Sequence, residues 1–158
     1  MNTLLWNLLL ALVWVAMNGE LSATNLVVGF ALGFLVLFFA RHVVGSPSYV
    51  MKAWQVASLF LFFVWEMFKA NLRVAFDVLT PRHRMRPGLL AVPLDARTDA
   101  EITLLANLIS LTPGTLSLDV SKDRRVLYIH MMYIDEDLDT ERNKIKRGFE
   151  RRVLEVLR

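Results

Sequence analysis

Few residues in this 158-residue chain have the types and spacing that chemistry requires. Asp135, Asp137 and Asp139 have the 1-3-5 spacing of a calcium-binding loop. The sixth position of such a loop is Thr140 instead of glycine, and the twelfth is Lys146 instead of glutamate. The pattern therefore favours an acidic helix start, which the helix macrodipole stabilises, over a calcium site.

Signatures of enzymes and metal proteins are missing from the sequence. The three histidines lie in separate segments without a metal-ligand spacing, and there is no cysteine (His42, His83, His130). Pro113-Gly114-Thr115 lacks the Gly-Lys-Ser/Thr ending of a phosphate-binding loop, and no G-x-S-x-G elbow is present. We expect no enzymatic activity, no metal and no cofactor, and we interpret His130 as a structural residue.

Two acidic residues border the apolar segments and are the default candidates for a proton pathway. Glu20 lies in a predicted turn, and Glu66 has Lys69 one helical turn further on. A basic neighbour at that spacing favours an ion pair. We therefore expect structural roles for both acids.

Charged residues are distributed very unevenly along the chain, and this distribution divides it into two parts with different surroundings. Residues 1–65 carry three charged side chains, whereas the remaining 93 residues carry thirty. A soluble domain needs polar cover over its surface, so the first part is predicted to be embedded in lipid. The second part holds 16 basic and 14 acidic residues, a balance that argues against a nucleic-acid partner.

Two apolar runs, Leu4–Met17 and Ser22–Ala40, predict two helices joined by a turn at residues 18–20. A cleaved signal peptide is the alternative for the first run, but no Lys or Arg precedes it. Gly29 and Gly33 form a G-x-x-x-G element, which lets a neighbouring helix approach closely in lipid. Two unrelated glycines are the alternative.

A third helix is predicted from about Tyr49 to Leu79. It is apolar through Trp65 and then carries a polar stripe typical of a stem that leaves the membrane (Glu66, Lys69, Arg73, Asp77). The first run reaches ~21 Å, short of the ~30 Å hydrocarbon core. Two full spans, three full spans and a shallow or re-entrant first hairpin therefore all stay open.

A basic cluster follows the stem, at Arg82, Arg84 and Arg86. Basic residues beside a membrane segment favour the cytoplasmic side. They also favour contact with anionic lipid headgroups. We expect residues 80–158 to form a cytoplasmic domain and residues 1–79 to form the transmembrane helices and stem.

The C-terminal domain is predicted to be β-α-β-β-α, with a three-stranded sheet. The strand starting at Val126 is apolar on both alternations, which is typical of a central strand, so the sheet order is first, third, second. Two helices cover one face of such a sheet and leave the other open. Because that open face includes large apolar side chains, we expect it to bind a partner.

The segment Thr112-Pro113-Gly114-Thr115 predicts a type II turn between the first helix and second strand of this domain. Proline presets φ at the second position, and glycine supplies the positive φ of the third. We expect the turn to be structural and to lie where the fold meets its partner. Thr112 and Thr115 either satisfy the turn or contact a neighbouring subunit.

The longest distinctive stretch is A-N-L-I-S-L-T-P-G-T-L-S-L-D-V at residues 106–120. Together with Val92-Pro93-Leu94, the hairpin at 121–130 and the hydrophobic anchor, it resembles the E subunit of the multisubunit Mrp-type Na⁺/H⁺ antiporters. The resemblance covers essentially the whole chain.

The resemblance implies an accessory subunit of a monovalent cation/proton antiporter in the cell membrane, with the other subunits as partners. It also implies a role in assembly and full activity, while the large subunits carry the proton paths. The alternative from another class is a free-standing, membrane-tethered regulatory domain that binds a cytoplasmic partner. Co-purification of a large complex distinguishes the two.

Overall fold

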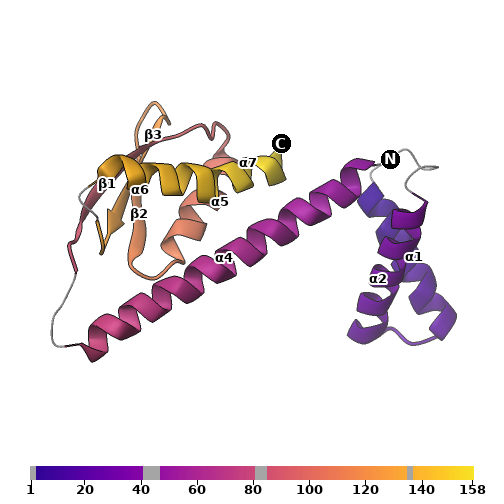
Figure 1. Ribbon diagram of the computed structural model, residues 1–158. Coiled ribbons are helices and arrows are strands. Elements are labelled where there is room, and N and C mark those ends of the chain that lie inside the picture. Colours follow the sequence, from indigo (N-terminus) through magenta and orange to yellow (C-terminus); the bar gives the residue numbers. More distant parts are fainter. Residues whose placement is uncertain (1–2, 41–46, 81–84, 135–136) are drawn as a thin grey trace. The chain divides into compact units, whose positions relative to one another are not determined.

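A computed structural model describes residues 3–40, 47–80, 85–134 and 137–158 of the chain (Figure 1). The chain forms two compact units, Met1–Trp54 and Gln55–Arg158. The elements follow in the order α1 (Thr3–Asn18), α2 (Ala23–Phe39), α4 (Pro47–Leu79), β1 (Gly88–Pro93), α5 (Asp99–Ser110), β2 (Thr115–Val120), β3 (Val126–Met131), α6 (Leu138–Ile145), η1 (Lys146–Glu150) and α7 (Arg151–Leu157). None of the helices in the described ranges combines the length and apolarity needed for a membrane span.

The two helices of the first unit pack along matching i, i+4 rows. The inward positions are Asn7, Ala11 and Val15 on α1, and Gly29, Gly33 and Leu37 on α2. A Cβ atom on Gly29 would lie 2.9 Å from the Ala11 carbonyl oxygen, and one on Gly33 would overlap the Asn7 side-chain oxygen. The G-x-x-x-G face therefore packs on a helix of the same chain, at a distance that only glycine permits.

The start of α4 is tied to this helical hairpin by Tyr49. The Asn7 amide nitrogen donates to the Tyr49 hydroxyl at 2.8 Å, and the Phe34 and Tyr49 rings are 5.8 Å apart. Asn7 is fully buried, and this bond satisfies its amide nitrogen, whereas its side-chain oxygen has no hydrogen-bond partner among the described residues.

The sheet has the predicted order β1-β3-β2, with both pairs antiparallel. Ile129 on β3 lies opposite Leu90 on β1 and Ser117 on β2. The β2–β3 register shifts by one residue between Ser117 and Asp119, which is the signature of a β-bulge. Pro93 lies on an edge strand, as expected from its missing N–H.

The core lies between the inward face of the sheet and the helices that follow it. Leu90, Leu127 and Ile129 from the strands are at most 1% exposed, as are Leu105 of α5 and Val153 of α7. The same cluster includes Leu59, Val92, Ile109, Met131 and Ile145. Burying aliphatic side chains of this size contributes ~1.5–3 kcal/mol each, so this layer supplies most of the stability of the domain.

The C-terminal helix differs from the continuous α-helix that the periodicity predicts. Lys146–Glu150 forms a π-helix of five residues between α6 and α7. The wider turn shifts the register by one residue, so Glu150 (1% exposed) takes an inward position while Phe149 is half-buried. Phe149 still packs against the core cluster, but only in part, because the π-helix turns Glu150 inward beside it.

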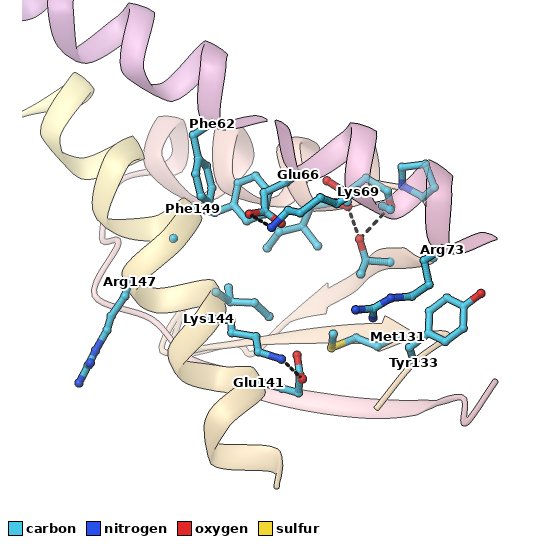
Figure 2. A pocket seen from close by; sticks show the side chains of 18 of the residues that line it. Phe62, Glu66, Lys69, Arg73, Met131, Tyr133, Glu141, Lys144, Arg147 and Phe149 are labelled. Carbon is cyan, nitrogen blue, oxygen red and sulfur yellow. Dashed lines mark hydrogen bonds and ion pairs between the residues drawn. The ribbon is translucent and has the colours of Figure 1, made fainter. Parts of the chain in front are cut away.

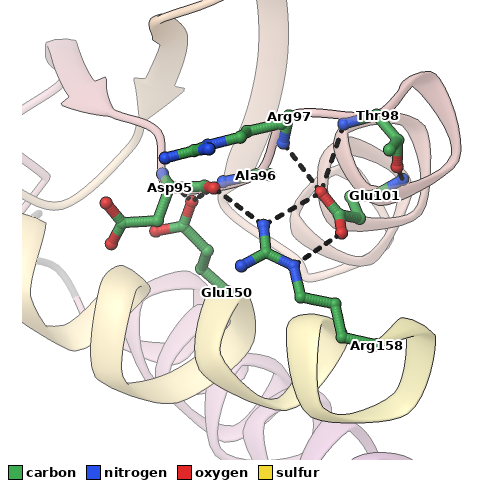
Figure 3. A network of polar contacts seen from close by, with 7 residues as sticks. All are labelled: Asp95, Ala96, Arg97, Thr98, Glu101, Glu150 and Arg158. Carbon is green, nitrogen blue, oxygen red and sulfur yellow. Dashed lines mark hydrogen bonds and ion pairs between the residues drawn. The ribbon is translucent and has the colours of Figure 1, made fainter.

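Two buried carboxylates hold the loop between β1 and α5 (Figure 3). Glu150 accepts backbone N–H groups of Asp95 and Ala96 at 2.6 and 2.9 Å. Glu101 accepts those of Arg97 and Thr98 at 2.7 and 3.2 Å. The sequence Thr98-x-x-Glu101 predicts a capping box, and the structure confirms it. Arg158 extends this network, because its Nε donates to Glu101 at 2.9 Å.

Both free edges of the sheet are capped by side chains. On β1, Arg142 donates to the Ala91 carbonyl at 3.0 Å and Lys146 donates to the Pro93 carbonyl at 2.9 Å. On β2, the Ser117 N–H donates to the Ser110 hydroxyl at 3.0 Å. Such contacts occupy backbone groups through which an edge strand could pair with another chain.

The Glu101 network predicts a defined loss of stability in acid. The Arg158 guanidinium, followed by the Arg97 and Thr98 N–H groups, lowers the Glu101 pKa from 4.5 to about 2. Since the folded pKa lies below the unfolded one, this stabilisation is complete above about pH 4.5 and disappears as pH falls toward 2. We predict that Glu101→Gln lowers the melting temperature at pH 7, and that its difference from the parent shrinks over this pH window.

Asp99→Asn on the same helix is the matched control. Asp99 pairs with Arg124 at 2.8 Å, but its side chain is 77% exposed, so the melting temperature should change little. A pH-independent difference between Glu101→Gln and the parent would contradict the account.

Candidate functional site

The turn at residues 112–115 has the backbone geometry that the sequence predicts. Gly114 has φ +84°, and the Thr115 N–H donates to the Thr112 carbonyl at 3.1 Å. The Thr112 hydroxyl donates to the Leu108 carbonyl at 3.0 Å. That of Thr115 donates to the Ile109 carbonyl at 2.5 Å and the Thr112 carbonyl at 2.9 Å. Both hydroxyls therefore satisfy carbonyls at the end of α5.

The polar stripe of α4 (Glu66, Lys69, Arg73, Asp77) faces the α/β domain that follows this helix in the chain. Lys69 and Glu66 form the expected ion pair at 2.7 Å. The Arg73 guanidinium lies over the Tyr133 ring, 5.3 Å from its centre, and Asp77 is 4% exposed. Burial, followed by the Asp77 carboxylate, raises the Tyr133 pKa, so this phenol stays protonated.

Phe62 holds the apolar half of the stem against the π-helix. Its ring packs edge-on against Phe149 at 5.1 Å, and the Arg152 guanidinium lies 3.9 Å from its centre. A Cβ atom on Gly148 would lie 3.0 Å from the Phe62 ring. The contact thus depends on a small residue in the π-helix. Gly148 is the one residue whose type, read from the sequence, could have indicated this contact.

A cavity of about 610 Å³ lies between α4, the 112–115 turn and the C-terminal helix (Figure 2). Its lining includes the apolar side chains of Phe62, Ile109, Met131, Ile145 and Phe149. Six basic side chains also line it, against two acidic ones. Sequence reasoning placed the turn and the stem in separate elements and did not foresee that they share a cavity.

The outward face of the sheet is open and apolar. Leu89 is 67% exposed, Leu116 49%, Leu118 52% and Tyr128 42%. His130 lies between Leu89 and Leu116 in the register of the three strands. The expectation of an apolar face that the helices leave uncovered is met, and such a face is typical of an interaction surface.

The other predicted site residues belong to separate segments of the chain. Glu20 lies in the turn after α1, where its carbonyl accepts from Asn25 at 2.9 Å. Arg86 forms an isolated bridge with Tyr133, whereas Arg82 and Arg84 lie outside the described residues. Glu20 belongs to the first unit and Arg86 to the second.

The acidic helix start is borne out in the part that is described. Asp137 is the N-cap of α6 and accepts from the Asp139 N–H at 3.0 Å. Asp135 lies outside the described residues. Among the described residues, no group of three or more His, Asp or Glu side chains could hold a metal ion.

Comparison with known proteins decides the family. A family model described as "Na⁺/H⁺ ion antiporter subunit" matches residues 7–156. The chain belongs to this family. It is 39% identical over 155 residues to the E subunit of the Na⁺/H⁺ antiporter of Bacillus subtilis, covering 98% of each chain. It is 38% identical over 153 residues to the corresponding E subunit from Alkalihalophilus pseudofirmus, covering 97% of this chain and 96% of the relative.

The fold of this member of the antiporter subunit family also occurs in a solved structure. A chain of the membrane-bound sulfane sulfur reductase, an archaeal respiratory membrane complex, aligns with a TM-score of 0.56 and 23% identity. The alignment covers 96% of each chain. The arrangement of helices and sheet is therefore shared with that chain.

The 112–115 turn of this antiporter subunit predicts a conformational requirement at Gly114. A Cβ atom there would lie 3.5 Å from Met132, which is an ordinary contact. The positive φ of Gly114, and not a lack of space, is therefore what restricts the residue type at this position. We predict that Gly114→Val destabilises the domain by roughly 1–2 kcal/mol or more, because a β-branched residue disfavours this conformation. Gly114→Asn should cost clearly less, since asparagine tolerates positive φ. Urea unfolding of the purified full chain measures both, and equal losses would contradict this assignment.

Proposed function

We propose that this chain is an accessory subunit of a multisubunit Na⁺/H⁺ antiporter, needed for assembly and full activity and not itself translocating ions. Family membership and the relatives named as E subunits of such antiporters support the antiporter assignment. The observation that carries the accessory role is the open sheet face, where four large apolar side chains are 42–67% exposed.

The distribution of charge supports a role outside the ion path. Proton pathways through membrane proteins use ionisable side chains inside the bundle. The sequences of α1 and α2 contain no charged residue, and Lys52 is the one charge in α4 before Glu66. Glu66 is held by Lys69, so its carboxylate acts as half of an ion pair. We therefore assign Glu66 and Glu20 structural roles.

The surfaces of α1 and α2 support an embedded location. Large apolar side chains are exposed on several sides of both helices, among them Leu4, Leu8, Leu12, Val27 and Leu35. In water such a surface would drive association, whereas in lipid it is the favourable one. The packing of Gly29 and Gly33 on α1 would then hold the anchor together.

The domain that follows α4 is proposed to lie in the cytoplasm. Arg82, Arg84 and Arg86 come directly after the stem in the sequence, and basic residues next to a membrane segment favour that side. The boundary between anchor and domain is proposed at residues 79 and 80, where α4 ends. With this topology the open sheet face is available to cytoplasmic surfaces of the other subunits.

The sheet face provides the test of this function. Leu116→Glu combined with Leu118→Glu places two charges on exposed positions of an edge strand, so the fold should survive. An apolar interface should not tolerate these charges, because burying an unpaired carboxylate is strongly unfavourable. We predict loss of co-purification with the other antiporter subunits in mild detergent and loss of Na⁺-driven pH change in everted vesicles.

Leu138→Glu combined with Leu157→Glu is the matched control. These leucines are 41% and 44% exposed, but they lie on the C-terminal helix and not on the sheet. Both assembly and exchange should be normal in this variant. Normal assembly and exchange in the Leu116/Leu118 variant would instead reject the sheet face as the interface.

A further inference from the structure

The cavity beneath α4 combines an apolar wall with a basic one. Phe62 and Phe149 line the apolar side, and Figure 2 shows the Phe62 ring directed at Phe149. The basic side includes Lys69 and Arg73 of α4 and Lys144 of α6. A volume of about 610 Å³ is within the range of pockets that hold small ligands.

The basic side chains of the cavity differ in whether they already form an ion pair with an acidic residue. Lys69 and Lys144 pair with Glu66 and Glu141 at 2.7 and 2.6 Å, and these are the two acids of the lining. The Lys69 ammonium has three donor hydrogens, so the Glu66 carboxylate does not exhaust it. Figure 2 shows Arg147 directed away from the cavity, so we assign it no role in binding.

Arg73 is the best placed of these cations. Figure 2 shows its guanidinium reaching from α4 into the cavity, between Lys69 and Met131. The Tyr133 ring, 5.3 Å away, supports it through a cation–π contact that leaves the N–H groups available. A planar, permanently charged fork of donors suits the oxygens of a phosphate.

The cavity runs along α4 across the change from apolar to charged side chains. Phe62 belongs to the apolar half of the helix and Arg73 to the charged half, eleven residues or ~16 Å further on. A ligand that touches both needs an apolar part and an anionic part in the same order. Inorganic phosphate fits the basic end alone.

We propose that this cavity binds the phosphate of an anionic phospholipid. Lys69 and Arg73 hold the phosphate oxygens, and the upper part of an acyl chain lies against Phe62 and Phe149. The phosphate chemistry follows from the cavity itself, whereas the lipid as its source rests on the proposed membrane location of α4. The lipid would fasten the stem to the α/β domain at the headgroup level.

The test uses the full chain purified in mild detergent and titrated with phosphatidylglycerol or phosphatidylcholine of identical acyl chains. Bound lipid is counted by native mass spectrometry. We expect phosphatidylglycerol to bind roughly tenfold more tightly, because basic side chains near the headgroup favour the anionic lipid. Equal affinity for the two lipids would overturn the proposal. So would displacement of phosphatidylglycerol by an equal concentration of inorganic phosphate, since the ligand would then be the free anion.

Variants assign the effect to the cavity. Lys69→Gln combined with Arg73→Gln should remove the preference for phosphatidylglycerol, whereas Lys69→Arg combined with Arg73→Lys should keep most of it. Lys122→Gln combined with Arg125→Gln removes the same charge from exposed positions at the β2–β3 turn and should have no effect. An equal loss in this control would refute the site.

The outcome is independent of the sheet-face interface. Lipid binding is measured on the isolated chain, so it does not require assembly with other subunits. If the neutral Lys69/Arg73 variant fails to fold, the lipid comparison on the parent and the charge-preserving variant still decides.

Discussion

The structure of the C-terminal domain depends on one constraint: its three-stranded sheet has two faces, and the helices of the domain cover only one of them. Leu90, Leu127 and Ile129 face this helical layer and are excluded from water. Because neighbouring side chains on a strand alternate, Leu89 and Tyr128 must then point the other way. The direction of these side chains is thus a consequence of how the first face is built, and an exposed apolar face of this kind is typical of an interaction surface.

The helical layer is held in place by buried charge in addition to apolar contact. Glu101 and Glu150 occupy successive N–H groups of the loop between β1 and α5, and Arg158 joins the end of the chain to that loop. Carboxylates can be buried there because each is met by several donors. The π-helix is what turns Glu150 inward, and it also brings Gly148 beneath Phe62. One irregularity therefore serves both the loop and the contact with the stem.

Local patterns in the sequence were sufficient for the strand order, the capping box and the 112–115 turn. The strand from Val126 is apolar on both alternations, and glycine at position 114 is the residue type that adopts a positive φ most readily. These features depend on residues that are close in sequence.

The features that sequence reasoning missed depend on contacts between distant residues. Glu101 and Arg158 are 57 positions apart, and nothing near either residue indicates the other. The π-helix follows from packing, because an uninterrupted α-helix would have presented Phe149 in place of Glu150. The cavity likewise requires α4 to lie beside the 112–115 turn, a tertiary arrangement that no local pattern encodes. The G-x-x-x-G element is intermediate: its spacing predicts a close helix contact, but not that α1 of the same chain provides it.

The central claim is that the open sheet face is buried in the antiporter, and it can be measured directly because the chain has no cysteine. Leu118→Cys introduces a single thiol on that face, and Leu157→Cys introduces one on the C-terminal helix. The account predicts that a maleimide labels the thiol at position 118 rapidly in the isolated chain and much more slowly in the assembled complex, while the thiol at position 157 reacts equally in both. Equal labelling of position 118 in the isolated chain and in the complex would contradict it.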